Sequence, residues 1–235
     1  MNIAIAMITH NRLEYSKRTL DSLLSTVRKP RLIVADNNST DGTKEWLYGP
    51  HKFTVIFNEE NLYPGAACNK AWECALEQWP DTKYLMRLDN DMHLEPGWLE
   101  AAESYFKAIP ELGQLGLDHD ALDHPKAALR AIEINGKTIN PWPGCVGGPN
   151  IIRRKLWDMG VRYQEMRWDD GRRSPMQEDS ALSKAIQDKG YMVGHMTDKK
   201  AWTFANIDNW KDYPEYYKKT LSDRGYDEKL KEANL

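Results

Sequence analysis

Two carboxylates separated by a single residue follow an apolar segment of the chain. Asp89 and Asp91 flank Asn90 directly after residues 83–88, a run that is typical of a buried strand. Alternate side chains of an extended segment point to the same side, so the two carboxylates would form one hard-oxygen site. Such a site suits Mg²⁺ or Mn²⁺ held jointly by the protein and a diphosphate. The alternative is a solvated turn in which these side chains cap the next segment.

A second polar cluster spans residues 36–42, DNNSTDG. Asp36 directly follows the predicted strand 31–35, and a carboxylate at the end of a strand can accept hydrogen bonds from a ribose or a base. The alternative is an Asx turn and a helix cap, which fits Asp41 better than Asp36. The position at a strand end favours ligand binding for Asp36.

A third acidic pair, Glu178 and Asp179, precedes the predicted helix 180–189. A carboxylate near a cleft can take the proton of an attacking hydroxyl if it reaches the nucleophile. Acidic residues in the first turn also interact favourably with the helix dipole, so capping explains the same pair. The spacing leaves both interpretations open.

These clusters need elements that bring them together. The sequence predicts strands at residues 2–9, 31–35, 53–57 and 83–88, with helices at 13–27, 43–47 and 66–78 between them. This alternation predicts an α/β fold with a parallel, helix-covered sheet. Right-handed crossovers bring the carboxyl ends of such strands to one edge, where open α/β sheets bind ligands. We therefore expect the polar clusters to converge on one cleft.

Regular alternation fades beyond residue 110. A hairpin is predicted around Asn135 and Gly136, a helix over 177–189 and a strand over 191–196. The last segment, 208–235, is highly charged and rich in tyrosine. We expect it to form a helical pair that packs on the domain through its aromatic rings.

Composition excludes several classes of protein. The 235 residues include 32 Lys and Arg against 35 Asp and Glu, so bulk charge does not favour nucleic acid or an anionic membrane as partner. No apolar run reaches the roughly 18–20 residues that cross a bilayer, and the first residues lack the features of a secretory signal. Three cysteines, an odd number without CxxC spacing, are expected to be reduced thiols rather than a disulfide framework. A cytoplasmic protein without integral membrane contact is expected.

The ordered set of motifs resembles the inverting family-two glycosyltransferases of the A-type fold. The motifs are Thr9-x-Asn11-Arg12, residues 36–43, Asn61 to Asn69, Asp89-Asn90-Asp91 and Glu178-Asp179. The resemblance covers roughly residues 1–195. It implies a single Rossmann-like domain with a mostly parallel sheet, flanking helices and a small antiparallel acceptor-side portion. It also implies a UDP-sugar donor, Mn²⁺ or Mg²⁺ as cofactor, and hexosyl or pentosyl transfer with inversion at the anomeric carbon.

The resemblance also implies roles for individual residues. Asp179 matches the general base with Glu178 as its neighbour, Asp91 matches the principal metal ligand, and His195 is the nearest candidate for a further metal ligand. The residues implied in donor binding are Thr9, Asn11, Arg12, Asp36, Asn38, Asn61, Asn69, Asp89, Asn90 and Gly148. The sequence departs from the family pattern at Tyr63, where glycine is usual.

We divide the expected domain, 1–207, into a nucleotide-sugar half, 1–91, and an acceptor half, 92–207, with 208–235 as a tail. We expect the acceptor to be a glycan, with a hydroxymethylated DNA base as the alternative. Basic residues 153–155 and 172–173 could contact phosphates or could be ordinary solvated charges. Aromatic rings that could stack on a sugar or a base are Trp142, Trp168 and Trp202.

Two other functions use similar residues. A nucleotidyltransferase shares the parallel sheet and acidic pair, but it is expected to have a Gly-rich loop after the first strand, and residues 9–17 contain no glycine. An inactive nucleotide-sugar-binding module would keep every motif above.

Overall fold

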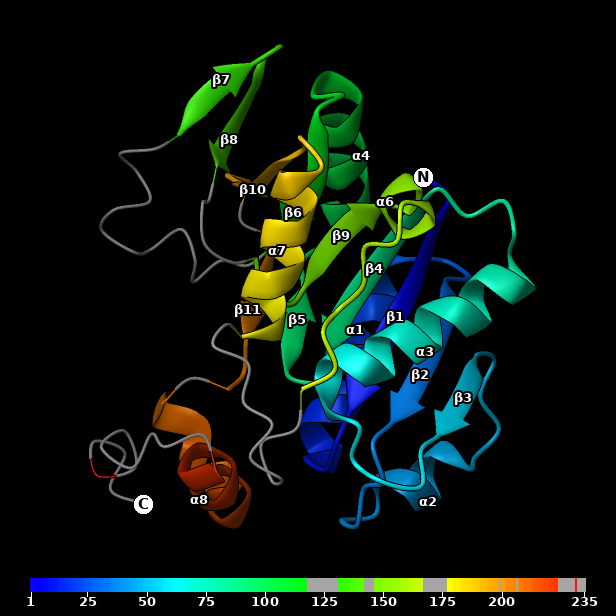
Figure 1. Ribbon diagram of the computed structural model, residues 1–235. Coiled ribbons are helices and arrows are strands. Elements are labelled where there is room, and N and C mark those ends of the chain that lie inside the picture. Colours follow the sequence, from blue (N-terminus) through cyan, green and yellow to red (C-terminus); the bar gives the residue numbers. More distant parts are fainter. Residues whose placement is uncertain are drawn as a thin grey trace.

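The N-terminal half alternates strands and helices, as the apolar periodicity predicts. The computed structural model describes residues 1–117, 131–141, 146–166, 177–198, 200–205, 207–223 and 231. The elements of this half are β1 (Ile3–Thr9), α1 (Leu13–Thr26), β2 (Arg31–Asp36), α2 (Thr43–Leu47), β3 (Thr54–Phe57), α3 (Tyr63–Gln78) and β4 (Tyr84–Asp89). Figure 1 shows α3 lying across one face of these strands.

Parallel pairing aligns the ends of these strands. β1 pairs with β2 on one side and with β4 on the other, so that Thr9 lies opposite Asp36 and Ile8 opposite Asp89. β3 continues the parallel arrangement beyond β2. The polar segments that follow β1, β2 and β4 therefore emerge at the same edge of the sheet.

The second half extends the sheet with mixed pairing. Its elements are β5 (Met92–Leu94), α4 (Trp98–Ala108), β6 (Leu112–Gly116), β7 (Ile132–Ile134), β8 (Lys137–Pro141), β9 (Asn150–Arg153), α6 (Arg154–Asp158), α7 (Glu178–Asp188), β10 (Met192–Met196) and β11 (Ala201–Thr203). Within the described residues, the main sheet has the order β3-β2-β1-β4-β9-β6-β10-β8-β7, and β5 pairs separately with β11.

Every antiparallel pair among the described residues includes a strand of this second half. β9 is antiparallel to both β4 and β6, and β7 and β8 form a hairpin. Its turn is at Asn135 and Gly136, which both have positive φ, as the sequence predicts. The α/β class with a smaller antiparallel portion is thus confirmed.

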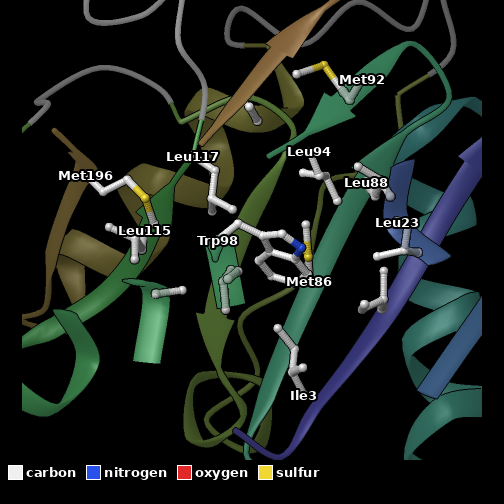
Figure 2. Packing of buried hydrophobic residues seen from close by; sticks show 14 of the residues in the cluster. Ile3, Leu23, Met86, Leu88, Met92, Leu94, Trp98, Leu115, Leu117 and Met196 are labelled. Atoms are coloured by element: carbon white, nitrogen blue, oxygen red, sulfur yellow. The ribbon is translucent and has the colours of Figure 1, made fainter. Parts of the chain in front are cut away.

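β1 is buried on both faces, as its unbroken apolar run predicts. Ile5 packs in a core cluster with α1 and α4, whereas Ala6 packs in a second cluster with α3. Figure 2 shows Trp98 of α4 at the centre of the first cluster, beside Met86 and Leu94. The rigid sheet between two cores gives the strand ends fixed positions.

The C-terminal segment contains a 3-10 helix, η2 (Ile207–Asp212), and α8 (Pro214–Asp223), drawn in orange and red in Figure 1. The expected helical pair is thus a 3-10 turn and one α-helix, and residues 224–230 and 232–235 lie outside the described part. None of the helices in the described residues has the length and apolar character needed to cross a membrane.

Candidate functional site

One pocket collects polar side chains at the carboxyl edge of the parallel strands. It has a volume of about 1210 Å³ and lies between the ends of β1, β2 and β4, the start of α7, and the segment η2–α8. The predicted site residues that line it are Asn11, Arg12, Asn38, Asn61, Asp89, Asn90, Asp91, Glu178 and Asp179. The structure therefore brings the Asp-Asn-Asp motif and the acidic pair of α7 into one pocket.

A buried arginine of β4 holds three of these carboxylates together. The Nε and Nη2 of Arg87 donate to the two carboxylate oxygens of Asp89 at 2.8 and 3.2 Å. Its Nη1 donates to Asp179 at 2.8 Å and lies 3.4 Å from Glu178 Oε1. Burial opposes the charge, but Asp179 and Asp89 more than offset it, so the pKa of Arg87 is raised well above its usual value. A permanent cation thus links the Asp-Asn-Asp motif to α7.

A second arginine holds the other end of the motif. Arg12 Nη1 donates to Asp91 Oδ2 at 2.7 Å, and its Nη2 donates to Asn90 Oδ1 at 2.6 Å. Nη1 also donates to the hydroxyl of Tyr217 at 3.3 Å, and the guanidinium lies 4.5 Å from the ring centroid of Tyr216. Burial lowers the pKa of Arg12, but Tyr216, Asp91 and Tyr217 raise it by more, so this guanidinium also stays charged.

The two groups carry an excess of negative charge. Four carboxylates face two guanidiniums, a net charge of −2 that a divalent cation would neutralise. Carboxylate oxygens are ligands that Mg²⁺ and Mn²⁺ prefer. Within the described ranges, no three His, Cys, Asp or Glu side chains form a ready metal cage. The residues therefore fit a metal whose coordination is completed by substrate phosphates and water.

Thr9 does not line the pocket, but its hydroxyl forms a hydrogen bond with Asn90, which does. Its hydroxyl is fully buried, hydrogen-bonds to Ser16 at 2.8 Å and accepts from Asn90 Nδ2 at 3.2 Å. The same amide donates to Ser16 Oγ and to the carbonyl of Asn11, both at 2.9 Å. The side chain of Asn90 therefore links the end of β4 to β1 and α1 by hydrogen bonds. These bonds fix the position of the chain between Asp89 and Asp91.

Asp36 and Asp41 both form turns within the chain. Asp36 is fully buried, lies outside the pocket lining, and accepts hydrogen bonds from the backbone N–H of Ser39 at 3.0 Å and from its hydroxyl. Asp41 accepts from the N–H of Leu13 at 2.9 Å and of Thr43 at 3.1 Å, which caps the starts of α1 and α2. Both residues therefore make turn or cap contacts in this structure, and the role of Asp36 in donor binding stays a prediction.

Asn69 and Gly148 also lie outside the lining. Asn69 makes two hydrogen bonds with the backbone of Tyr163, at 2.9 and 3.1 Å, and faces a smaller pocket of about 400 Å³. A Cβ at Gly148 would lie 2.6 Å from Asp89 Oδ2. Glycine at this position lets the backbone approach the Asp89 carboxylate closely, and a larger residue would displace that carboxylate.

His195 is placed away from the carboxylates. It lies in β10, with Gly116 of β6 and Asn140 of β8 as its neighbours in the sheet, and it is 1% exposed. It does not line the pocket that contains Asp91. Burial lowers the pKa of His195 to about 4, so the ring is neutral at pH 7.

This burial predicts a pH-dependent stability. The unfolded chain binds a proton at His195 near pH 6.5, whereas the folded chain does so only near pH 4. The stability that the neutral, buried His195 ring gives to the folded state is therefore fully present above pH 6.5 and is lost as the pH falls toward 4. Between pH 7 and pH 5, the wild-type free energy of unfolding should fall by about 2 kcal/mol more than that of His195→Gln. Urea unfolding of both proteins measures this difference, and equal losses would contradict it.

The same variant tests whether His195 is a metal ligand. Unchanged Mn²⁺ affinity in His195→Gln would place His195 outside the metal site.

The basic and aromatic residues predicted to contact the acceptor either lie outside the pocket lining or fall outside the described part of the chain. Arg153 is engaged by the backbone carbonyls of residues 106, 109 and 112, at 2.6 to 3.1 Å, and Arg154 pairs with Asp158. Trp202 stacks on His93 with centroids 4.0 Å apart, on the separate sheet β5–β11. Residues outside the described ranges are Trp142, Trp168, Arg172 and Arg173.

Sequence reasoning missed Arg87 and the C-terminal tyrosines. A signal for Arg87 existed, because a charged residue two positions before Asp89 in an apolar strand shares its face. For Tyr216 and Tyr217 the sequence predicts packing by aromatic rings, but not their contact with Arg12.

Solved structures share the architecture at low identity. A mannosyltransferase from Pyrobaculum calidifontis, in complex with GDP-Man and Mn²⁺, matches with a TM-score of 0.64 and 17% identity over 96% of this chain and 69% of its own. TarS from S. aureus matches with a TM-score of 0.61 and 16% sequence identity. The match covers 90% of this chain and 38% of TarS. GalNAc-T7 with UDP, GalNAc and Mn²⁺ matches with a TM-score of 0.60 and 15% sequence identity. The match covers 100% of this chain and 55% of GalNAc-T7.

Among the curated proteins, no match was found. The family model described as glycosyl transferase family 2 matches residues 4–158, which include β1 to β4, the Asp-Asn-Asp motif and β9. This match covers more than half of the chain. The chain therefore belongs to glycosyl transferase family 2.

Proposed function

We propose that this glycosyltransferase moves a hexose or pentose from a UDP-sugar to an acceptor hydroxyl, with inversion and with Mn²⁺ or Mg²⁺ as cofactor. One observation carries the proposal: the Asp89-Asn90-Asp91 motif and Asp179 line the same pocket and are joined by Arg87. The ligands of two structural neighbours, GDP-Man with Mn²⁺ and UDP with GalNAc and Mn²⁺, support it.

The donor would occupy the end of the pocket formed by β1, β2 and β4. Asn11, Asn38 and Asn61 line that end and offer amide groups to a ribose or base. Asp89 and Asp91 would hold the metal with the donor diphosphate. When bound, the metal stabilises the negative charge that the leaving phosphate gains.

Asp179 is the proposed base. Its carboxylate takes the proton of the acceptor hydroxyl as that oxygen bonds to the anomeric carbon. The bond from the anomeric carbon to the phosphate oxygen breaks, and its electron pair leaves with the nucleoside diphosphate. Arg87 donates to both Asp179 and Asp89 and so holds the base in register with the Asp-Asn-Asp motif. Attack opposite the leaving group inverts the configuration.

The pocket favours a neutral acceptor. Carboxylates far outnumber cations along its lining, so the phosphates of a DNA strand would be repelled. The acidic lining residues are Glu14, Asp41, Asp89, Asp91, Glu178, Asp179, Asp212 and Glu215, and the basic ones are Arg12, Arg87 and Lys219. A glycan hydroxyl is therefore the acceptor that we propose over a hydroxymethylated base. Residues 1–91 would supply most of the donor site and 92–207 the acceptor side, with the tail 208–235 closing the pocket.

The experiment is a donor screen. The protein is incubated with UDP-sugars and GDP-mannose, with and without Mn²⁺, and nucleoside diphosphate release is measured. Metal-dependent release from one donor class, increased by glycan acceptors and not by hydroxymethylated DNA, is expected. Metal-dependent thermal stabilisation by a donor without release would identify an inactive binding module. Neither release nor stabilisation with any donor would overturn the proposal.

A further inference from the structure

Arg12 occupies a strained position between β1 and α1. Both Asn11 and Arg12 have left-handed backbone angles, with φ of 55° and 59°, which residues other than glycine adopt at a cost. The turn brings the guanidinium to Asp91, which follows the neighbouring strand β4. Only 7% of Arg12 is exposed, so its charge is held almost entirely by neighbouring groups.

The contact with Asp91 competes with a metal ion. Arg12 Nη1 lies 2.7 Å from Asp91 Oδ2, and both residues line the pocket. A guanidinium and a divalent cation cannot both approach one carboxylate oxygen closely without strong repulsion. Arg12 must therefore leave Oδ2 before a metal can use that atom. Its Nε is buried and has no hydrogen-bond partner among the described residues, so a donor phosphate could accept from it.

The C-terminal segment holds Arg12 in place. The hydroxyl of Tyr217 accepts from Arg12 Nη1 at 3.3 Å, and Tyr216 stacks on the guanidinium. The segment is anchored on α1 by two further contacts: Tyr15 donates to Asp212 at 2.9 Å, and the hydroxyl of Tyr213 accepts from the backbone N–H of residue 14 at 3.2 Å. Tyr213, Tyr216 and Tyr217 lie beyond residues 4–158, the span of the family match.

We propose that Tyr217 is a positioning residue that holds Arg12 on Asp91 and thereby sets the affinity of the pocket for a divalent cation. The proposal rests on the proposed function, because it takes Asp91 as a metal ligand. With a metal and diphosphate bound, Arg12 would donate to a phosphate oxygen in place of Asp91, so that the guanidinium and the carboxylate would each keep an oppositely charged partner. The C-terminal segment is then a part of the metal site that acts through one arginine.

Mn²⁺ binding to the full chain without nucleotide tests this role, with free Mn²⁺ measured by electron paramagnetic resonance. Arg12→Met removes the competing cation and should tighten Mn²⁺ binding about tenfold, the equivalent of one charge-assisted hydrogen bond. Tyr217→Phe keeps the ring but loses the hydroxyl, and should tighten binding about threefold. Tyr48→Phe removes an exposed tyrosine hydroxyl outside the pocket lining, and should leave Mn²⁺ affinity unchanged.

The sign of the effect separates this role from a structural one. Damage to the pocket lowers Mn²⁺ affinity, whereas loss of the competitor raises it. In the presence of saturating Mn²⁺, Arg12→Met should bind UDP about tenfold more weakly, because the phosphate loses a partner.

Asp91→Asn separates failure of this proposal from failure of the proposed function. If that variant loses Mn²⁺ binding while Arg12→Met and Tyr217→Phe bind Mn²⁺ as the wild type does, the positioning role is overturned and Asp91 remains a metal ligand. If Asp91→Asn binds Mn²⁺ as the wild type does, Asp91 is not a metal ligand, and both proposals about it are overturned.

Discussion

Asp179→Asn is expected to slow sugar transfer by about 10²–10⁴-fold, the usual contribution of a general base. The amide cannot take the proton of the acceptor hydroxyl, although its oxygen can still accept the hydrogen bond that Arg87 donates to Asp179 at 2.8 Å. The variant should therefore fold normally and bind Mn²⁺ and UDP as the wild type does. Single-turnover transfer rates and UDP titration measure the two effects separately.

A matched control lies in the same helix. Asp188, at the other end of α7, is exposed and pairs with Lys184 at 2.8 Å, so Asp188→Asn should keep the wild-type rate. Glu178→Gln distinguishes the two members of the acidic pair. Full transfer by Asp179→Asn with loss in Glu178→Gln would assign the base to Glu178, and full transfer by both would leave α7 without a base.

Asp91→Asn is expected to reduce metal-dependent transfer by about 10³-fold or more, because a metal supplies several kcal/mol of charge stabilisation in the transition state. The substitution removes one negative charge from the group of four carboxylates and two guanidiniums. The fold should survive, since an amide oxygen can still accept from Arg12 Nη1, which lies 2.7 Å from Oδ2 in the wild type. Transfer rates over a range of Mn²⁺ concentrations measure the loss.

Asp81 offers a control outside the pocket. It pairs with Arg31 at 2.8 Å, as Asp91 pairs with Arg12, but it is exposed. Asp81→Asn should therefore leave the Mn²⁺ dependence of transfer unchanged. Wild-type transfer by Asp91→Asn at low Mn²⁺ would contradict its role as the principal ligand.

The strand ends of the N-terminal half follow from the sequence because their signal is local. β1 and β2 are short apolar runs bounded by polar turns, and parallel pairing with crossover helices leaves few possible arrangements. Asp89 and Asp91 were found for the same reason, since both follow such a strand directly. The Asn135-Gly136 turn was predicted from two adjacent residues whose positive φ angles suit a hairpin.

The second half is different because its pairing joins distant segments. β9 begins at residue 150 and lies between β4 and β6, antiparallel to both. No periodicity within a single segment indicates which strands it will separate, because strand neighbours are chosen by packing across the whole sheet. The burial of His195 in β10 follows from the same arrangement, which places its ring beside Gly116 rather than beside Asp91.

The sequence by itself determined the α/β class, the edge of the sheet at which polar residues gather, and the carboxylates that reach the pocket. Only the tertiary structure decided what those carboxylates contact: Asp89 and Asp179 share Arg87, while Asp91 is held by Arg12 beneath Tyr217. The physical reason is one of range. Backbone pattern and strand ends depend on neighbours in the chain, whereas the partner of a buried charge is whichever opposite charge the packed fold brings within hydrogen-bond distance.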